Sequence, residues 1–221
     1  MTADVDSFVL DYWRWLHEPA TLRRYRHLSD TAYGPTTELI GGVLSRMAAV
    51  SKRRQYPELW HIDYLWYPSR GIRSQLYYSG QKERRWPIGA PAFAIEHENY
   101  GHFNVAAAFL RLLGVRAANR VLIGWSYAPA SSIKRLLRVR DHAVKSNCWP
   151  ARDKVEVIFH DANSTEPTLY VSRVGRTSCD TTHFPTRVRP ANSPLQQTGR
   201  GSRAQTRRAT VRGRTAERQP R

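Results

Sequence analysis

The sequence predicts an α/β protein, with a small central mixed β-sheet flanked by helices and a disordered C-terminal tail. Segments with helical spacing of apolar residues alternate with short strand-like segments, in the order αβββαβ followed by one more helix and strand. After residue 174 the composition changes to Arg, Thr, Ser, Gln and Pro, with too few large apolar residues to offset the entropy of ordering. We therefore expect one domain over residues 1–174 and a disordered Arg-rich tail over residues 175–221.

Two helical regions are predicted before the first strand. Residues 7–28 have apolar side chains at helical spacing but contain Pro19, so we expect one or two short helices there. A longer helix is predicted after Gly34-Pro35-Thr36-Thr37, where apolar residues recur at helical spacing up to Met47. Glu38 lies in the first turn of this helix, where a carboxylate favours the positive end of the helix dipole.

Three strands are predicted to follow as a meander. Residues 59–67 (LWHIDYLWY) are rich in aromatic and β-compatible side chains and end at a Pro-Ser-Arg-Gly turn. Residues 72–79 are the expected hairpin partner, residues 81–90 are expected to be irregular, and residues 91–98 form the third strand. The later elements are a helix over 103–113 capped by Gly114, a buried strand over 120–126, a basic helix over 131–145, a strand over 154–160 and an edge strand over 168–174.

The third strand ends on two carboxylates in the stretch PAFAIEHENYGH, residues 91–102. Because side chains alternate along a strand, Glu96 and Glu98 share one face, with Cβ atoms roughly 6–7 Å apart, and His97 lies on the other. Asp63, late in the first predicted strand, joins them if both strands turn these faces to the same side. Three clustered carboxylates need a cation to neutralise them, and such oxygen ligands suit Mg²⁺ or Mn²⁺.

Glu38, just upstream, could supply a fourth carboxylate to this site. A metal ion held in this way can activate water for attack on a phosphodiester and can stabilise the charge that develops on the phosphorus oxygens. The net charge agrees with a polyanionic partner, since 35 Lys and Arg residues against 18 Asp and Glu residues give +17. Residues 173–221 hold 12 Arg, one Asp and one Glu, a net charge of +10, so the rest of the chain carries +7.

Asp63 followed by Glu96-His97-Glu98, in αβββαβ order, resembles the PD-(D/E)XK nuclease superfamily, also called restriction-endonuclease-like. The resemblance covers residues 36–126, and IEHEN followed by a helix and a strand is similar to a group of small bacterial proteins of unassigned function. The resemblance implies a metal-dependent endonuclease that hydrolyses phosphodiester bonds in DNA with Mg²⁺ or Mn²⁺. It also implies that Asp63 and Glu96 bind the metal ion and that Glu98 binds it or orients the attacking water.

The sequence departs from the superfamily pattern at two positions. Ile62, not Pro, precedes Asp63, and Glu98 stands where the superfamily has the lysine that positions or activates the attacking water. In this superfamily a second Glu can take that position, or a basic residue can move to the following helix, where Arg111 lies. Arg111 would stabilise charge on the phosphate but, being permanently protonated, could not act as a general base. The alternative is a catalytically inactive relative that binds nucleic acid or a protein partner.

The basic helix over residues 131–145 is the candidate contact surface for nucleic acid, with DNA expected rather than RNA. Lys134, Arg135 and Arg138 could contact phosphates. Solvated charge on an amphipathic surface helix is the default interpretation of the same residues. The Arg-rich tail could also bind nucleic acid, or it could be an extension without function.

Simpler interpretations exist for single residues of the candidate site. Glu98 could be the exposed end of an edge strand, and Asp63 could cap a strand end. For His97 a hydrogen-bonded position in the core is favoured. A zinc-protease site is not expected, because His97 and His102 are five positions apart, whereas two rings on one helical face need four.

The sequence also predicts a soluble cytoplasmic protein without membrane contact. The N-terminal residues are acidic where a signal peptide would be basic, and no segment approaches the ~20 apolar residues of a membrane span. Cys148 and Cys179 are the only cysteines, too few for a disulfide framework or a zinc site.

Overall fold

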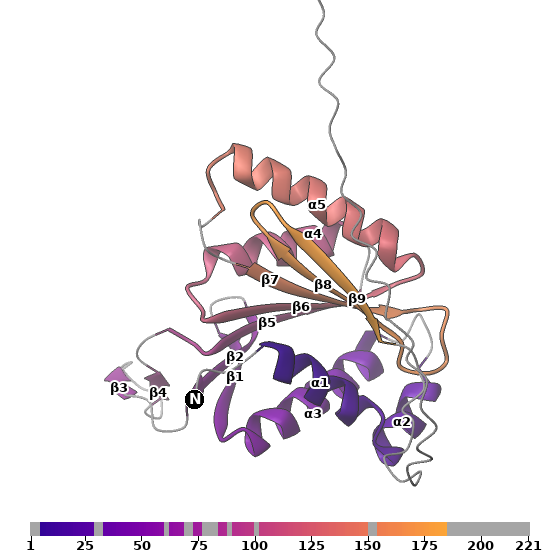
Figure 1. Cartoon of the computed structure of the whole chain (residues 1–221). Coiled ribbons are helices and arrows are strands. Elements are labelled where there is room, and N and C mark those ends of the chain that lie inside the picture. Colours follow the sequence, from indigo (N-terminus) through magenta and orange to yellow (C-terminus); the bar gives the residue numbers. More distant parts are fainter. Residues whose placement is uncertain are drawn as a thin grey trace, which may run out of the picture. The chain divides into compact units, whose positions relative to one another are not determined.

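The centre of the computed structural model is a seven-stranded mixed sheet with helices on both faces (Figure 1). The structure describes residues 5–28, 33–59, 62–68, 73–76, 84–87, 90–99, 102–149 and 154–184. The helices are α1 (Val5–Leu16), α2 (Pro19–Arg26), α3 (Tyr33–Val50), α4 (His102–Gly114) and α5 (Pro129–Lys145). The strands are β1 (Arg53–Leu59), β2 (Ile62–Pro68), β3 (Arg73–Leu76), β4 (Arg84–Pro87), β5 (Phe93–Glu98), β6 (Asn119–Ser126), β7 (Lys154–Asp161), β8 (Leu169–Gly175) and β9 (Cys179–Phe184).

The strands of the large sheet follow the order β1-β2-β5-β6-β7-β8-β9. β5, β6 and β7 run parallel, whereas β1–β2, β2–β5, β7–β8 and β8–β9 pair antiparallel. Helices α4 and α5 make the two crossover connections that parallel pairing requires. The predicted α/β class with a mixed sheet is confirmed, and the sheet is larger than an αβββαβ core.

The two faces of the sheet carry separate hydrophobic clusters. Helices α1, α2 and α3 cover one face, where Tyr12 packs in one cluster with Phe93 (Figure 1). Helices α4 and α5 cover the other face, where Phe109 packs in a second cluster with Ala94. Since side chains alternate along β5, Phe93 faces the first cluster and Ala94 the second, and Glu96 continues on the side of Ala94. This places Glu96 under α4.

The helices form where the sequence predicts them, with differences at their starts. Pro19 lies in the first turn of α2, where its missing N–H costs no hydrogen bond. α3 begins at Tyr33, earlier than predicted, so Glu38 falls in its second turn and not its first. Within the described residues, no helix combines the length and apolar composition needed to cross a bilayer.

The N-terminal strands differ from the prediction. The predicted strand over 59–67 is in fact the end of β1 and most of β2, and the chain contains an unpredicted strand upstream. Pro57 argues against a strand in the sequence, because proline cannot donate a backbone hydrogen bond to a neighbouring strand. β1 nevertheless forms, since it lies at the sheet edge, where proline is tolerated. β3, the described part of the predicted hairpin strand over 72–79, pairs with β4 and not with β2, and β4 lies inside the segment 81–90 that was expected to be irregular. Residues 72 and 77–79 lie outside the described residues. The meander exists, but its strands are β1, β2 and β5.

The folded chain continues past the predicted boundary at residue 174. β9 pairs with β8 from Leu169 opposite Phe184 to Val174 opposite Cys179, so β8 is not the sheet edge. β9 buries few side chains and is held by backbone pairing, which composition does not reveal. The rest of the predicted tail, residues 185–221, lies outside the described residues.

Candidate functional site

Two glutamates at the end of β5 share one arginine from α4. Arg111 donates from Nε to Oε1 of Glu96 at 2.8 Å and from Nη2 to Oε2 of Glu96 at 3.0 Å. Nη2 also donates to Oε1 of Glu98 at 3.1 Å. The contact with Glu96 uses two parallel hydrogen bonds, the most specific geometry between a guanidinium and a carboxylate. Glu96 and Glu98 thus lie on one face of β5, as the alternation predicts.

Asp63 approaches the same place from β2. The β2–β5 register pairs Tyr64 with Ile95, which puts Asp63 opposite Glu96 one residue further along. Oδ2 of Asp63 accepts the backbone N–H of His97 at 2.7 Å. Asp63 is also close enough to Glu96 to raise the pKa of its carboxyl. Asp63, Glu96 and Glu98 therefore form one group, called the carboxylate cluster below.

Burial dominates the electrostatics of the carboxylate cluster. The side chain of Glu96 is 0% exposed, and this burial raises the pKa of its carboxyl to about 7. The hydrogen bonds from Arg111 oppose the rise in pKa, whereas the charge of Asp63 adds to it. Burial likewise raises the pKa of Glu98, again against the effect of Arg111. Near neutral pH, the carboxyl of Glu96 therefore retains its proton in part of the molecules.

The donor atoms of the carboxylate cluster suit a hard divalent ion, but their arrangement is not that of a metal cage. Among the described residues, no group of three or more His, Cys, Asp or Glu side chains is arranged to hold a metal ion. Both oxygens of Glu96 and one of Glu98 instead point at the guanidinium of Arg111. The cation that neutralises the cluster in this structure is an arginine of the chain itself.

Glu38, the predicted fourth carboxylate, lies apart from the cluster. Its side chain is 77% exposed on α3, and its Oε2 lies 3.9 Å from Nη2 of Arg24 on α2. α3 covers the face of the sheet opposite to α4 (Figure 1). The sequence places Glu38 close to the other acids along the chain, but the sheet separates them in space.

Two buried histidines lie on the α1–α3 side of the sheet. His160, at the end of β7, is 0% exposed; the hydroxyl of Tyr12 lies 2.9 Å from its Nε2 and that of Tyr25 lies 3.1 Å from its Nδ1. His97 is also buried, as predicted, and its Nε2 has no hydrogen-bond partner in the described part of the chain. Burial lowers the pKa of both histidines to about 3. No local sequence pattern singles out His160.

Helix α5 presents a row of basic residues to solvent. Lys134, Arg135 and Arg138 are exposed, while Ile133 and Leu136 pack toward the sheet. This is the pattern of an amphipathic surface helix, and it leaves the three cations free to meet a polyanion. Phosphate contact by these residues stays a prediction.

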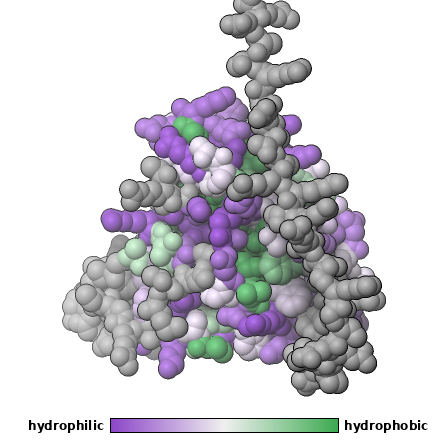
Figure 2. Space-filling view, in the orientation of Figure 1, coloured by the Kyte–Doolittle hydropathy of each residue, from purple (hydrophilic) through white to green (hydrophobic). Residues whose placement is uncertain are grey.

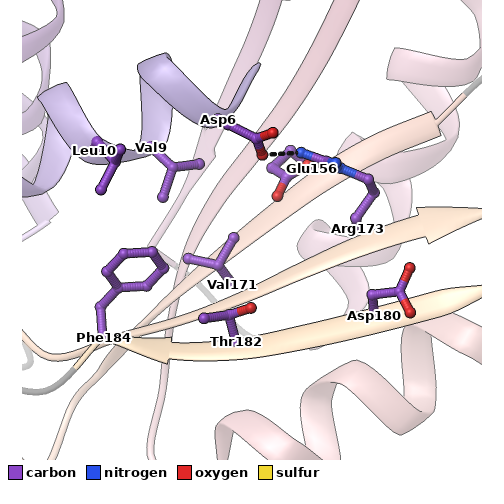
Figure 3. A pocket seen from close by; sticks show the side chains of 9 residues that line it. All are labelled: Asp6, Val9, Leu10, Glu156, Val171, Arg173, Asp180, Thr182 and Phe184. Carbon is purple, nitrogen blue, oxygen red and sulfur yellow. Dashed lines mark hydrogen bonds and ion pairs between the residues drawn. The ribbon is translucent and has the colours of Figure 1, made fainter. Parts of the chain in front are cut away.

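A cavity of about 250 Å³ lies on the other side of the sheet, between α1 and the strands β7 to β9 (Figure 3). Arg173 forms an ion pair with Asp6 and donates from Nε to Oε2 of Glu156 at 3.0 Å. The apolar part of the lining comes from Val9, Leu10, Val171 and Phe184. Figure 2 shows hydrophobic atoms on this face, where α1 meets the strands. No residue of the carboxylate cluster lines this cavity. Arg173, which does line it, is already paired with Asp6 and Glu156.

Fold and site together define a mixed α/β protein with an arginine-neutralised carboxylate cluster at the end of its parallel strand β5. Comparison of the chain with protein-family models, with curated proteins and with solved structures finds no significant match. Function is therefore inferred from the chemistry of the site.

Proposed function

We propose that this chain is a divalent-metal-dependent nuclease that hydrolyses phosphodiester bonds in DNA, with a restriction-endonuclease-like core. The observation that carries the proposal is the convergence of Asp63, Glu96, Glu98 and Arg111 from three separate elements. A buried carboxylate group of this kind is costly without function, because desolvation disfavours each charge. A cytoplasmic location is part of the same proposal.

The order of elements also supports the proposal. α3, β1, β2, β5, α4 and β6 follow one another as αβββαβ, with β3 and β4 inserted as a separate two-stranded sheet. Asp63 comes from the second strand of this series, and the Glu-x-Glu element from the third. The acids therefore occupy the strands on which the resembled superfamily carries its metal ligands.

The chain's own groups have separate tasks in this proposal. Asp63, Glu96 and Glu98 would hold Mg²⁺ or Mn²⁺, which supplies an activated water and stabilises negative charge on the phosphate. Arg111 is 39% exposed and can donate to a phosphate oxygen from the open side of the cluster. The exposed cations of α5 would hold the DNA backbone and add affinity that falls with salt.

Cleavage of supercoiled plasmid in Mg²⁺ or Mn²⁺ tests the proposal. The wild type should nick or linearise the plasmid, whereas Asp63→Asn and Glu96→Gln should lose at least about 100-fold in rate, the scale for loss of one group that stabilises charge in the transition state. Asp11→Asn is the matched control, because Asp11 is 53% exposed on α1 and forms an ion pair with Arg14 of the same helix, away from the carboxylate cluster. Activity that survives both cluster variants would refute the assignment.

A second candidate function is nucleic-acid binding without catalysis. It is favoured by the bonds of Arg111 to Glu96 and Glu98, which fill the place of a metal ion in this structure. In that case the wild type cleaves no nucleic acid but binds DNA with salt-dependent affinity. Arg135→Ala together with Arg138→Ala would then weaken binding similarly for all sequences and reduce the salt dependence by about one charge per residue.

A further inference from the structure

We propose that the outer edge of β9 is a docking surface for an extended segment of a partner protein. The segment adds a strand to the large sheet and places a lysine or arginine side chain in the cavity beside α1 (Figure 3). The inference goes beyond the proposed nuclease and does not depend on it, because no residue of the carboxylate cluster lines this cavity.

The two edges of the large sheet differ in how they resist pairing with another strand. β1 (RRQYPEL) carries two arginines and Pro57, and charged side chains and proline are common means of preventing edge pairing. β9 (CDTTHF) has no proline, lysine or arginine, and it pairs with β8 without a bulge. Among the described residues, no strand pairs with the outer edge of β9. β9 is therefore the edge at which a further strand can be added.

The hydrogen-bond pattern of the β8–β9 hairpin shows which backbone groups of β9 face outward. The N–H of Gly175 donates to the carbonyl oxygen of Ser178 at 2.9 Å, so these two residues form a hydrogen-bonded pair. Such pairs alternate with non-hydrogen-bonded pairs along an antiparallel ladder. In the β8–β9 register, Asp180 therefore directs its N–H and C=O to β8. Thr181 and His183 direct theirs to the open edge, where an added strand can bond them.

The cavity adjoins this edge on the α1 side of the sheet (Figure 3). Its β9 lining comes from Asp180, Thr182 and Phe184, which alternate along the strand and share one face. A side chain of the added strand that lies opposite these residues points to the same side and enters the cavity. Val9 and Leu10 of α1 offer apolar surface for the stem of that side chain, and Leu10 is 44% exposed. At about 250 Å³ the cavity is smaller than the ~300–1,000 Å³ of small-molecule sites, so it suits one long side chain.

The charges that line the cavity favour a positive side chain. Three acids (Asp6, Glu156 and Asp180) and Arg173 leave a formal charge of −2 when all four are ionised. Arg173 lies opposite Asp180 in the β8–β9 register, but its guanidinium is paired with the other two acids. Asp180 thus forms no ion pair among the described residues, and a lysine or arginine of the partner can supply one. A second copy of β9 would bring another Asp180 to this edge, so charge favours a basic partner over self-association.

Fluorescence anisotropy of a labelled peptide with the full chain tests the docking. The probe is Thr-Val-Thr-Arg-Thr-Val-Thr with blocked ends, because its alternation puts the arginine and both valines on one face. A second peptide with citrulline in place of the arginine keeps the shape and loses the charge. The arginine peptide should bind, and the citrulline peptide should bind about threefold or more weakly, the scale of a partly exposed ion pair. Equal affinity of the two peptides, or no binding of the arginine peptide, overturns the inference.

Four variants assign the binding to β9. Asp180→Asn should reduce the affinity for the arginine peptide to that for the citrulline peptide, whereas Asp141→Asn, which removes an exposed acid on α5, should leave it unchanged. Thr181→Pro removes an outward N–H and no bond to β8, and should weaken binding of both peptides about tenfold or more. Thr181→Val is its control, because it loses the same hydroxyl, which bonds Ser172, but keeps the N–H. Binding by Thr181→Pro as strong as by Thr181→Val overturns strand addition at β9.

Amide hydrogen exchange of the wild type, followed by nuclear magnetic resonance, covers the case in which Thr181→Pro fails to fold. In the free protein the amides of Asp180 and Thr182 should exchange slowly and those of Thr181 and His183 fast, and the arginine peptide should slow the latter two. Fast exchange of Thr181 and His183 at saturating peptide overturns the inference.

Slow exchange of Thr181 and His183 without peptide also overturns the inference. Protection that grows with protein concentration would mean that a second copy occupies the edge of β9. Protection that is independent of concentration would mean that a segment of the same chain occupies it.

Discussion

Replacement of His160 by glutamine should make the protein less sensitive to mild acid. The ring of His160 is enclosed by Tyr12, Tyr25 and Trp125 at the end of β7, and its pKa is lowered to about 3, first by burial and then by the neighbouring His97. The folded protein therefore keeps this ring neutral. The unfolded chain protonates it below its ordinary pKa of about 6.5.

The sign and size of the effect follow from proton linkage. Between about pH 6.5 and pH 3 the unfolded state binds a proton that the folded state does not, so stability falls as the pH falls through this window. At pH 5 the loss from one such histidine is about 2 kcal/mol, and at pH 4 about 3 kcal/mol. His97 adds a similar amount, because its pKa is also lowered to about 3. Glu96 acts in the opposite direction, since its raised pKa of about 7 lets the folded state take up a proton as the pH falls toward 4.5.

Urea unfolding of wild type and His160→Gln at pH 8 and pH 5 isolates the contribution of His160, because the other groups cancel in the difference. Glutamine retains one donor and one acceptor for the two tyrosine hydroxyls but does not titrate. The free energy of unfolding should fall by about 2 kcal/mol less in the variant than in the wild type between the two pH values. His142→Gln, an exposed change on α5, should behave as the wild type does. An identical pH dependence of wild type and His160→Gln would refute the reasoning.

Two further predictions concern stability and are checked by the same unfolding measurement at neutral pH. Arg173→Met removes the partner of Glu156, which is 6% exposed, and should lower the free energy of unfolding by about 2–3 kcal/mol. Adding Glu156→Gln should recover part of this loss, because the buried charge is then removed as well. Equal stability of the single and double variants would contradict this. Gly124→Ala should cost about 1–3 kcal/mol, because the added Cβ would lie 2.9 Å from the ring of Phe159, which is 1% exposed. A neutral effect at Gly124 would mean that the ring has room to shift.

The alternation of side chains along β5 could be predicted from local sequence, and so could the face of the strand on which each side chain lies. Glu96 and Glu98 lie on one face and His97 on the other, because the period of a strand depends on the backbone alone. The helices from α1 to α5 were likewise recognisable by apolar spacing and by Pro19. Arg111 was a candidate only through the resemblance, in which a basic residue can move to the helix that follows the acids.

Strand pairing could not be predicted in the same way. β1 and β9 lie at the two edges of the large sheet and are held by hydrogen bonds to β2 and β8, which leave little pattern in their side chains. His160 was missed for a related reason. Its partners Tyr12 and Tyr25 are 148 and 135 residues away along the chain, so no local pattern shows that they meet.

The sequence by itself determined the α/β class, the net charge of +17 and the presence of three acids on strand positions that allow them to converge. Only the tertiary structure decided which acids meet. The sheet places Glu38 on the far side with Arg24, and it brings Asp63 beside Glu96 through the β2–β5 register. It also decided that the cation among these acids is Arg111. The pairing of strands and the packing of α4 set distances between residues far apart in the chain, and those distances determine which charges neutralise one another.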